Sequence, residues 1–114
     1  MNKNTFLKSY FKDLKSLLEF DENTIQKILD VSDILINTNK NKKKTLIFGN
    51  GGSSAIASHF SVDITKNAKI RCLNLNEYDL ITCFANDYGY ERWVEKAIDF
   101  YGDEGDNLII ISSS

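Results

Sequence analysis

Apolar side chains recur every three or four positions through the first forty residues, the spacing that lines one face of an α-helix. The first series predicts a helix over residues 4–19 and comprises Phe6, Leu7, Tyr10, Phe11, Leu14, Leu17 and Leu18. A second series runs from Ile25 to Ile36. Asp21 precedes it as a candidate N-cap, so this helix should reach about Thr38. The chain should therefore open with a helical hairpin over residues 1–40, whose wide apolar faces pack against other subunits.

Beyond residue 44, short β-prone segments alternate with amphipathic helical ones. The predicted strands are residues 45–48, 70–75 and 107–111, and the predicted helices are residues 53–66, 78–85 and 91–101. The last strand is nearly all apolar and β-branched, which is typical of a central parallel strand covered on both faces. This alternation predicts a three-layer α/β sandwich with a central parallel sheet over residues 44–114.

The composition fits one globular domain over residues 1–114, because 42% of the side chains are apolar and the formal net charge is only −2. No strong field attracts nucleic acid or a membrane surface, so neither is expected as a partner. No apolar stretch could span a bilayer or resemble a signal peptide, which predicts a cytoplasmic protein. Residues 40–44 should form a solvated loop, and Cys72 and Cys83 should be reduced residues of the core.

The run Gly49-Asn50-Gly51-Gly52-Ser53 lies between a predicted strand and a predicted helix. Glycines permit a tight turn there, and a helix N-terminus offers unpaired N–H groups to an anion, so we predict a phosphorylated small molecule as ligand. The dinucleotide-binding fingerprint would need glycine at position 54, which is serine, and the Lys-Ser/Thr pair of nucleotide hydrolases is absent. The same residues could instead form a turn in which a serine caps the helix and no ligand binds.

His59 and Asp63 are four residues apart on the predicted helix, so both side chains can reach one proton or one metal ion. Asp63 projects close to the direction of Ile56, on the apolar side of the helix. Partial burial there would favour a general base. The alternatives are a His–Asp pair at a subunit contact, or an Asp63 neutralised by Lys66.

Two further segments offer polar groups to a sugar phosphate. Asn86 and Asp87 fall in a predicted loop, where an amide and a carboxylate suit sugar hydroxyls, although such a pair also marks an ordinary helix break. Ser112, Ser113 and Ser114 follow a predicted strand, where parallel sheets place their ligand loops, although a frayed tail is also compatible. Because a chain rarely ends at such a loop, we expect at least one further helix and strand in the natural protein.

Taken together, these segments resemble the sugar isomerase (SIS) domain, and within it the bacterial phosphoheptose isomerases. The resemblance rests on residues 49–53, 59–60, 86–90 and 105–114, in the family's order and rough spacing, and it covers essentially the whole chain. It implies a flavodoxin-like three-layer fold, a homotetramer, and a single SIS domain that lacks its C-terminal part.

The resemblance also implies roles for individual residues. The implied substrate-binding residues are Asn50, Gly51, Gly52, Ser53, Asp63, Asn86 and Asp87, with Ser112, Ser113 and Ser114 beginning the phosphate-binding loop. His59 matches a zinc ligand, and Asp63 occupies the position of a glutamate that is both metal ligand and catalytic base. The family's other metal ligands, a glutamine and a second histidine, would lie beyond residue 114.

The implied reaction converts sedoheptulose 7-phosphate into D-glycero-D-manno-heptose 7-phosphate, for cell-surface polysaccharide synthesis, by proton transfer through an enediol. The chain departs from the family pattern between Ser53 and His59, where members commonly carry an acid and a glutamine. At Asp63, aspartate replaces glutamate and withdraws the carboxylate by about 1.5 Å, a change that bears on substrate and on rate. Two alternatives therefore stay open: a non-catalytic relative that binds a replication initiator, and a sugar-phosphate sensor.

Overall fold

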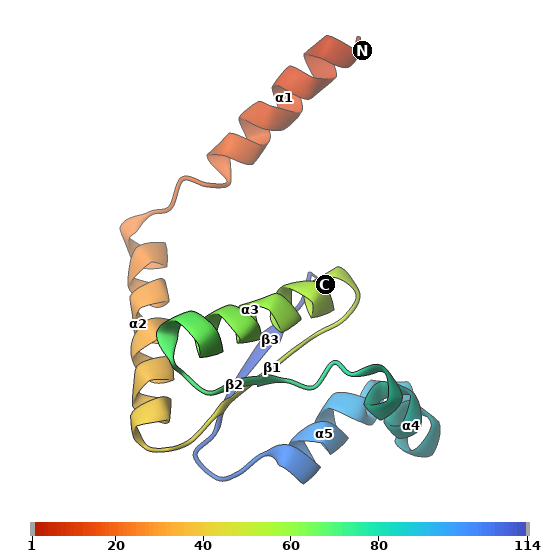
Figure 1. Cartoon of the computed structure of the whole chain (residues 1–114). Helices are drawn as coiled ribbons and strands as arrows, with labels where there is room; N and C mark the ends of the chain where they lie inside the picture. The colour runs from red at the N-terminus through yellow and green to blue at the C-terminus, as the bar shows by residue number, and fades with distance from the viewer. Residues whose placement is uncertain (1, 114) are drawn as a thin grey trace. The chain divides into compact units, whose positions relative to one another are not determined.

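A computed structural model describes residues 2–113 and divides the chain into two compact units, Met1–Ser32 and Asp33–Ser114. The first unit contains α1 (Lys3–Ser16) and the start of α2 (Glu22–Lys40). The second unit contains the end of α2, followed by β1 (Thr45–Gly49), α3 (Gly52–Ala68), β2 (Cys72–Asn74), α4 (Tyr78–Tyr88), the 3₁₀ helix η1 (Tyr90–Arg92), α5 (Trp93–Tyr101) and β3 (Asn107–Ile111) (Figure 1).

The helices at the N-terminus are confirmed. As predicted, the Asp21 side chain caps α2, because its Oδ1 accepts a hydrogen bond of 2.8 Å from the Thr24 N–H. Hydrogen bonding to Thr24 also lowers the pKa of Asp21. α1 ends at Ser16, three residues before the predicted end, where the Ser16 hydroxyl donates to the Asp13 carbonyl and competes with the helix ladder. No described residue of α1 is buried, so its apolar stripe covers no core within its own unit.

The sheet is parallel, with strand order β2-β1-β3. β1 is therefore the central strand, and all five of its residues are buried. The prediction that residues 107–111 form the central strand is wrong within the described residues, because β3 lies at the edge and its Leu108 and Ile110 side chains are exposed. An apolar β-branched run indicates a strand, but it does not reveal which strands lie beside it.

The three-layer arrangement is confirmed. Successive side chains of β1 point to opposite faces of the sheet, so Ile47 packs with Ala57 of α3, whereas Leu46 and Phe48 pack with the α5 side. On that second face the rings of Phe48 and Trp93 meet edge to face, with centroids 5.7 Å apart. α3 thus covers one face of the sheet, and α4 and α5 cover the other (Figure 1).

A buried ion pair fixes the N-terminal end of β1. Lys44 immediately precedes β1, and its side chain is only 7% exposed. Its Nζ lies 2.7 Å from Asp103 and 2.5 Å from Asp106, and the Asp106 Oδ1 accepts a hydrogen bond from the Lys44 N–H. The prediction that residues 40–44 form a solvated loop is therefore wrong for Lys44. Lys44 is buried because the tertiary fold brings it next to two aspartates that follow some sixty residues later in the sequence.

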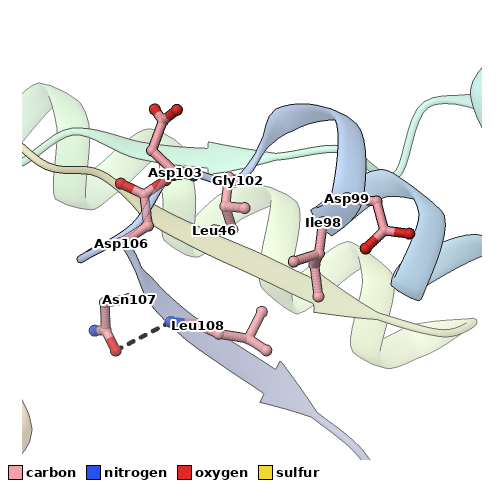
Figure 2. A pocket seen from close by; sticks show the side chains of 8 residues that line it. All are labelled: Leu46, Ile98, Asp99, Gly102, Asp103, Asp106, Asn107 and Leu108. Atoms are coloured by element: carbon pink, nitrogen blue, oxygen red, sulfur yellow. Dashed lines mark hydrogen bonds between the residues drawn. The ribbon is translucent and has the colours of Figure 1, made fainter.

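The two aspartates belong to the turn between α5 and β3, and Figure 2 shows both beside the start of β3. Burial by itself would raise the pKa of Asp106, but hydrogen bonds from the Lys44 side chain, the Lys44 N–H and the Asp103 N–H lower the pKa to about 2. Hydrogen bonds to Asp103 and to Asp106 raise the pKa of Lys44. Asp106 is thus held as a carboxylate that locks the α5–β3 turn onto β1.

We predict that Asp106→Asn lowers the free energy of unfolding of the second unit by about 3 kcal/mol, because the variant leaves the buried Lys44 without its closest partner. Since the folded pKa lies below the ordinary value of 3.8, this stabilisation is complete above that pH and is lost as the pH falls towards 2. The difference between wild type and variant in urea unfolding should therefore shrink over that interval.

Asp99→Asn is the matched control, because Asp99 is also a partner of a lysine, Lys96, but in an exposed pair on α5. Its effect should stay below about 0.5 kcal/mol. Equal destabilisation by Asp106→Asn and Asp99→Asn would contradict the buried-pair account.

Candidate functional site

The glycine-rich turn after β1 brings two backbone segments into direct contact. A Cβ at Gly49 would overlap the backbone carbonyl of Ser53, so only glycine fits there. The backbone of Gly51 has φ 58°, in the left-handed region that residues other than glycine adopt only at a cost in free energy. The Ser53 N–H donates to the Asn50 carbonyl at 3.1 Å. The N-cap of α3 is Gly51 and makes no side-chain hydrogen bond, so the alternative in which a serine caps this helix is wrong.

A cavity of about 300 Å³ lies at the carboxyl ends of β1 and β3. Its lining consists of Phe48, Gly49, Asn50, Tyr90, Glu91, Trp93, Val94, Ile110, Ile111 and Ser112. Gly49 pairs in register with Ile111, so the residues that follow, Asn50 and Ser112, leave the sheet side by side. The structure thus brings together two of the predicted substrate-binding residues, from segments more than sixty positions apart in the sequence.

The other predicted residues of these two turns lie near this cavity without lining it. Gly51, Gly52 and Ser53 form the cap and first turn of α3. Ser113 follows β3 and is exposed, and Ser114 lies outside the described residues. The N-terminus of α3 and the end of β3 therefore face the same edge of the sheet, where parallel α/β folds bind their ligands.

Two cavity residues, Tyr90 and Glu91, were not predicted. Both belong to η1, which starts directly after Gly89, a residue with φ 94°. The Tyr90 hydroxyl donates to the Asn50 Oδ1 at 2.5 Å, so η1 is tied to the glycine-rich turn. Gly89 indicated a turn at this point of the sequence. The contact of Tyr90 with Asn50 depends on the tertiary fold, which the pattern of apolar and polar residues does not specify.

Asn74, the last residue of β2, and Asn76, two residues later, hold the end of β1, and they too were missed. The Asn76 Nδ2 donates to the Gly49 carbonyl at 2.7 Å, and its Oδ1 accepts from the Gly49 N–H at 3.3 Å. The Asn74 Nδ2 donates to the Ile47 carbonyl at 2.9 Å. These side chains continue the hydrogen bonding of β1 where β2 has ended, and so they fix the point from which the glycine-rich turn departs. In the sequence, the only indication of this role was that Asn74 and Asn76 stand two positions apart, as residues on one face of a strand do.

His59 and Asp63 lie on α3 and face one another, with 3.4 Å between the His59 Nε2 and the Asp63 Oδ2. The predicted partial burial of Asp63 is wrong, because its side chain is 52% exposed and that of His59 is 79% exposed. The apolar neighbour used for that prediction, Ile56, is itself exposed, although Phe60 and Ile64 of α3 pack against the core. The side of α3 that carries Ile56 and Asp63 therefore lies in solvent. Neither His59 nor Asp63 lines the cavity described above.

Asn86 and Asp87 lie in the last turn of α4, not in a loop, because the helix continues to Tyr88 before Gly89 ends it. Both are exposed, and the Asn86 Nδ2 donates to the Asp87 Oδ1 at 3.0 Å. The Asp87 carboxylate raises the pKa of Cys83, one turn earlier. Cys83 is exposed, which corrects the prediction that it belongs to the core, whereas Cys72 is buried as predicted, and burial raises its pKa to about 11.

Imidazole nitrogen and carboxylate oxygen are suitable zinc donors, so the His59–Asp63 pair fits two positions of a metal site. Among residues 2–113 no group of three or more His, Cys, Asp or Glu side chains could hold a metal ion. Any further ligands would have to come from outside the described residues.

A second cavity, of about 330 Å³, lies near the start of β3 and is lined by Leu46, Ile98, Asp99, Gly102, Asp103, Asp106, Asn107 and Leu108 (Figure 2). Three carboxylates in the lining repel a phosphate, and two of them already neutralise Lys44. This cavity is therefore unsuited to a phosphate and is lined by the aspartates that pair with Lys44. The cavity beside Asn50 is the candidate for a phosphorylated ligand.

The SIS domain model matches residues 9–114 of the chain. The chain belongs to the SIS domain family. Its relatives include the phosphoheptose isomerase of Fusobacterium nucleatum, which is 35% identical over 100% of the chain and 61% of the relative. The corresponding enzyme of Helicobacter pylori strain 26695 is 36% identical over 95% of the chain and 60% of the relative.

Solved structures give the same likeness for this SIS domain. The phosphoheptose isomerase of Francisella tularensis superposes with a TM-score of 0.89 and 26% identity over 100% of the chain and 62% of that protein. A phosphoheptose isomerase from Neisseria gonorrhoeae, with a TM-score of 0.86 and 24% identity over 99% of the chain and 62% of that protein, has the same fold. The chain thus spans about three fifths of the length of these relatives. None of the helices within residues 2–113 has the length and apolar character needed to cross a membrane.

We predict that Gly49→Ala lowers the free energy of unfolding by about 2 kcal/mol, because the added methyl group forces the end of β1 away from the first turn of α3. Gly52→Ala, three residues later, is the control: a Cβ at Gly52 meets nothing within 4 Å, so this variant should be neutral or slightly stabilising. Urea unfolding of both variants measures the difference, and similar destabilisation by both would refute the close-approach argument.

Proposed function

We propose that this SIS domain is part of an aldose–ketose isomerase that converts sedoheptulose 7-phosphate into D-glycero-D-manno-heptose 7-phosphate. The observation that carries the proposal is the cavity at the carboxyl ends of β1 and β3, where Asn50 and Ser112 meet beside the N-terminus of α3. The relatives that bear the name phosphoheptose isomerase match the chain over nearly its whole length, which supports the same reaction.

The arrangement suits a phosphorylated sugar. The phosphate would lie at the N-terminus of α3, where the first N–H groups of the helix favour an anion, and beside the serines that follow β3. Glu91 lines the same cavity and repels phosphate, so the hydroxyl-bearing part of the sugar would extend towards Glu91. The apolar walls formed by Phe48, Trp93 and Val94 would exclude water from one side of the sugar.

The reaction needs a base that moves a proton between adjacent carbons of the sugar. Asp63 would remove the proton beside the carbonyl group and return it to the neighbouring carbon, and His59, 3.4 Å away, would hold the carboxylate in place. A zinc ion held by His59, Asp63 and ligands outside the described residues would supply electrophilic stabilisation of the developing negative charge. The N–H groups of the glycine-rich turn would fix the sugar relative to Asp63. The cytoplasmic location remains a prediction from the apolar pattern of the sequence, and the contribution to cell-surface polysaccharide synthesis remains a prediction of the resemblance.

We predict that the full-length protein converts sedoheptulose 7-phosphate, that a chelator abolishes the conversion, and that added zinc restores it. Asp63→Asn should lower the rate about 10²- to 10⁴-fold, because asparagine is nearly isosteric but cannot accept a proton. Asp63→Glu should keep or raise the rate, because it restores the longer carboxylate. The measurement is the rate of aldose formation.

Asp99→Asn on α5 controls for the loss of an exposed carboxylate and should leave the rate unchanged. Equal rates of wild type and Asp63→Asn would exclude Asp63 as the base. Absence of conversion by both proteins would favour the non-catalytic binding protein, which the exposure of the His59–Asp63 pair would then suit.

We further infer that the protein is a homo-oligomer, a tetramer as the resemblance implies, in which the N-terminal helices contact other subunits. The apolar stripe of α1 supports this: Phe6, Tyr10, Phe11 and Leu14 are all exposed. Monomers rarely leave so long an apolar stripe in water.

We predict that light scattering of the full-length protein at micromolar concentration gives the mass of a tetramer, and that Phe11→Glu gives a smaller species because it places a charge in the apolar stripe. Lys12→Glu, which changes the adjacent residue without touching the stripe, should keep the wild-type mass. A monomeric wild-type protein would contradict the inference.

A further inference from the structure

Tyr90 makes a contact that no predicted role accounts for. Its ring and its neighbour Glu91 line the cavity at the carboxyl ends of β1 and β3, and its hydroxyl donates to the Asn50 Oδ1 at 2.5 Å. The two residues are forty positions apart: Asn50 lies in the glycine-rich turn and Tyr90 begins η1. Gly51 (φ 58°) follows Asn50, and Gly89 (φ 94°) precedes Tyr90.

This hydrogen bond determines how the Asn50 amide is presented. An asparagine side chain has one acceptor oxygen and one donor nitrogen, and either could face a ligand. Because the Asn50 Oδ1 accepts the hydrogen bond from the Tyr90 hydroxyl, the amide is held in one orientation, with its Nδ2 pointing away from Tyr90. Within residues 2–113, the Asn50 Nδ2 donates no hydrogen bond of its own. The donor therefore stays available for an oxygen of the bound molecule.

The contact also stabilises the wall of the cavity. The Asn50 side chain belongs to the short turn between β1 and α3, whose two ends are held by the Asn76 amide at Gly49 and by the helix at Ser53. The Asn50 side chain is exposed, and among residues 2–113 it has no other hydrogen-bond partner to restrict its rotamers. The Tyr90 hydroxyl, which belongs to η1, supplies that restriction.

We propose that Tyr90 is a positioning residue, which orients the Asn50 amide so that its Nδ2 donates to an oxygen of the sugar phosphate. This inference rests on the proposed isomerase function and goes beyond it, because it assigns the donor side of Asn50 and the group that sets it. Tyr90 acts through Asn50 and does not touch the reacting atoms, so its loss affects binding of the sugar more than the proton transfer.

The test is a double-mutant cycle in the full-length protein, with Tyr90→Phe, Asn50→Ala and the double variant, assayed with sedoheptulose 7-phosphate. Tyr90→Phe removes only the hydroxyl, so kcat/KM should fall about five- to tenfold, mainly through KM, the size of effect that one hydrogen bond gives. In the Asn50→Ala background the same substitution should change kcat/KM less than twofold.

Tyr101→Phe is the matched control, because it removes a hydroxyl from an exposed tyrosine at the end of α5 outside this cavity. It should leave kcat/KM and the thermal midpoint unchanged, and Tyr90→Phe should leave the thermal midpoint within about 1 °C of wild type. A thermal midpoint that falls in Tyr90→Phe as strongly as in Asn50→Ala, with equal effects of Tyr90→Phe in both backgrounds, would make Tyr90 merely structural and overturn the proposal.

Failure of the isomerase proposal remains distinguishable. If the wild type shows no conversion, the isomerase proposal is refuted. Calorimetry then measures the dissociation constant of sedoheptulose 7-phosphate for the wild type and for each variant of the cycle. Weaker binding by Tyr90→Phe that disappears in the Asn50→Ala background supports the positioning role. Equal binding by wild type and Tyr90→Phe, or no binding by any of the proteins, overturns it.

Discussion

The parallel, in-register pairing of β1 with β3 is the constraint on which the candidate site depends. β1 is buried along its whole length, so neither its direction nor its register can change without exposing the core. Gly49 then stands opposite Ile111, and both strands end at the same level. The glycine-rich turn and the first serine after β3 therefore leave the sheet together, although more than sixty residues separate them in the sequence.

The opposite end of the same two strands carries a different chemistry. Lys44 enters β1 as a buried cation that two aspartates of the α5–β3 turn neutralise, and the backbone of Lys44 hydrogen bonds to Asp106 and to Asn107. One end of the sheet is thus rich in carboxylates and serves stability, whereas the other presents a helix N-terminus and amide groups to the solvent. This polarity follows from the parallel arrangement, which gathers all strand starts at one edge and all strand ends at the other.

The features that depend on local pattern could be predicted from the sequence, and those that depend on distant contacts could not. Helical periodicity located α1, α2 and α3, and the position of the glycines located the strand-to-helix turn. The burial of Lys44 could not be predicted, because its partners lie in a turn some sixty residues away. The contact between Tyr90 and Asn50 was hidden for the same reason. For Asp63, helical periodicity predicted a position beside Ile56 but could not reveal that Ile56 is exposed, so the predicted burial of Asp63 is wrong.

The exposure of His59 and Asp63 bears directly on mechanism. Charged groups in contact with bulk water interact weakly, and a carboxylate surrounded by water is a poor base for a carbon-bound proton. For Asp63 to act in the proposed isomerisation, groups other than the described residues must cover α3 and exclude water there. The cavity beside Asn50 already has the apolar walls and the fixed amide that the proposed sugar-phosphate site requires, whereas the His59–Asp63 edge has only the two groups proposed for the proton transfer. Within residues 2–113 the two proposed parts of the site are therefore formed to different degrees: the proposed binding cavity is enclosed on its apolar side, whereas the proposed proton-transfer pair is still open to solvent.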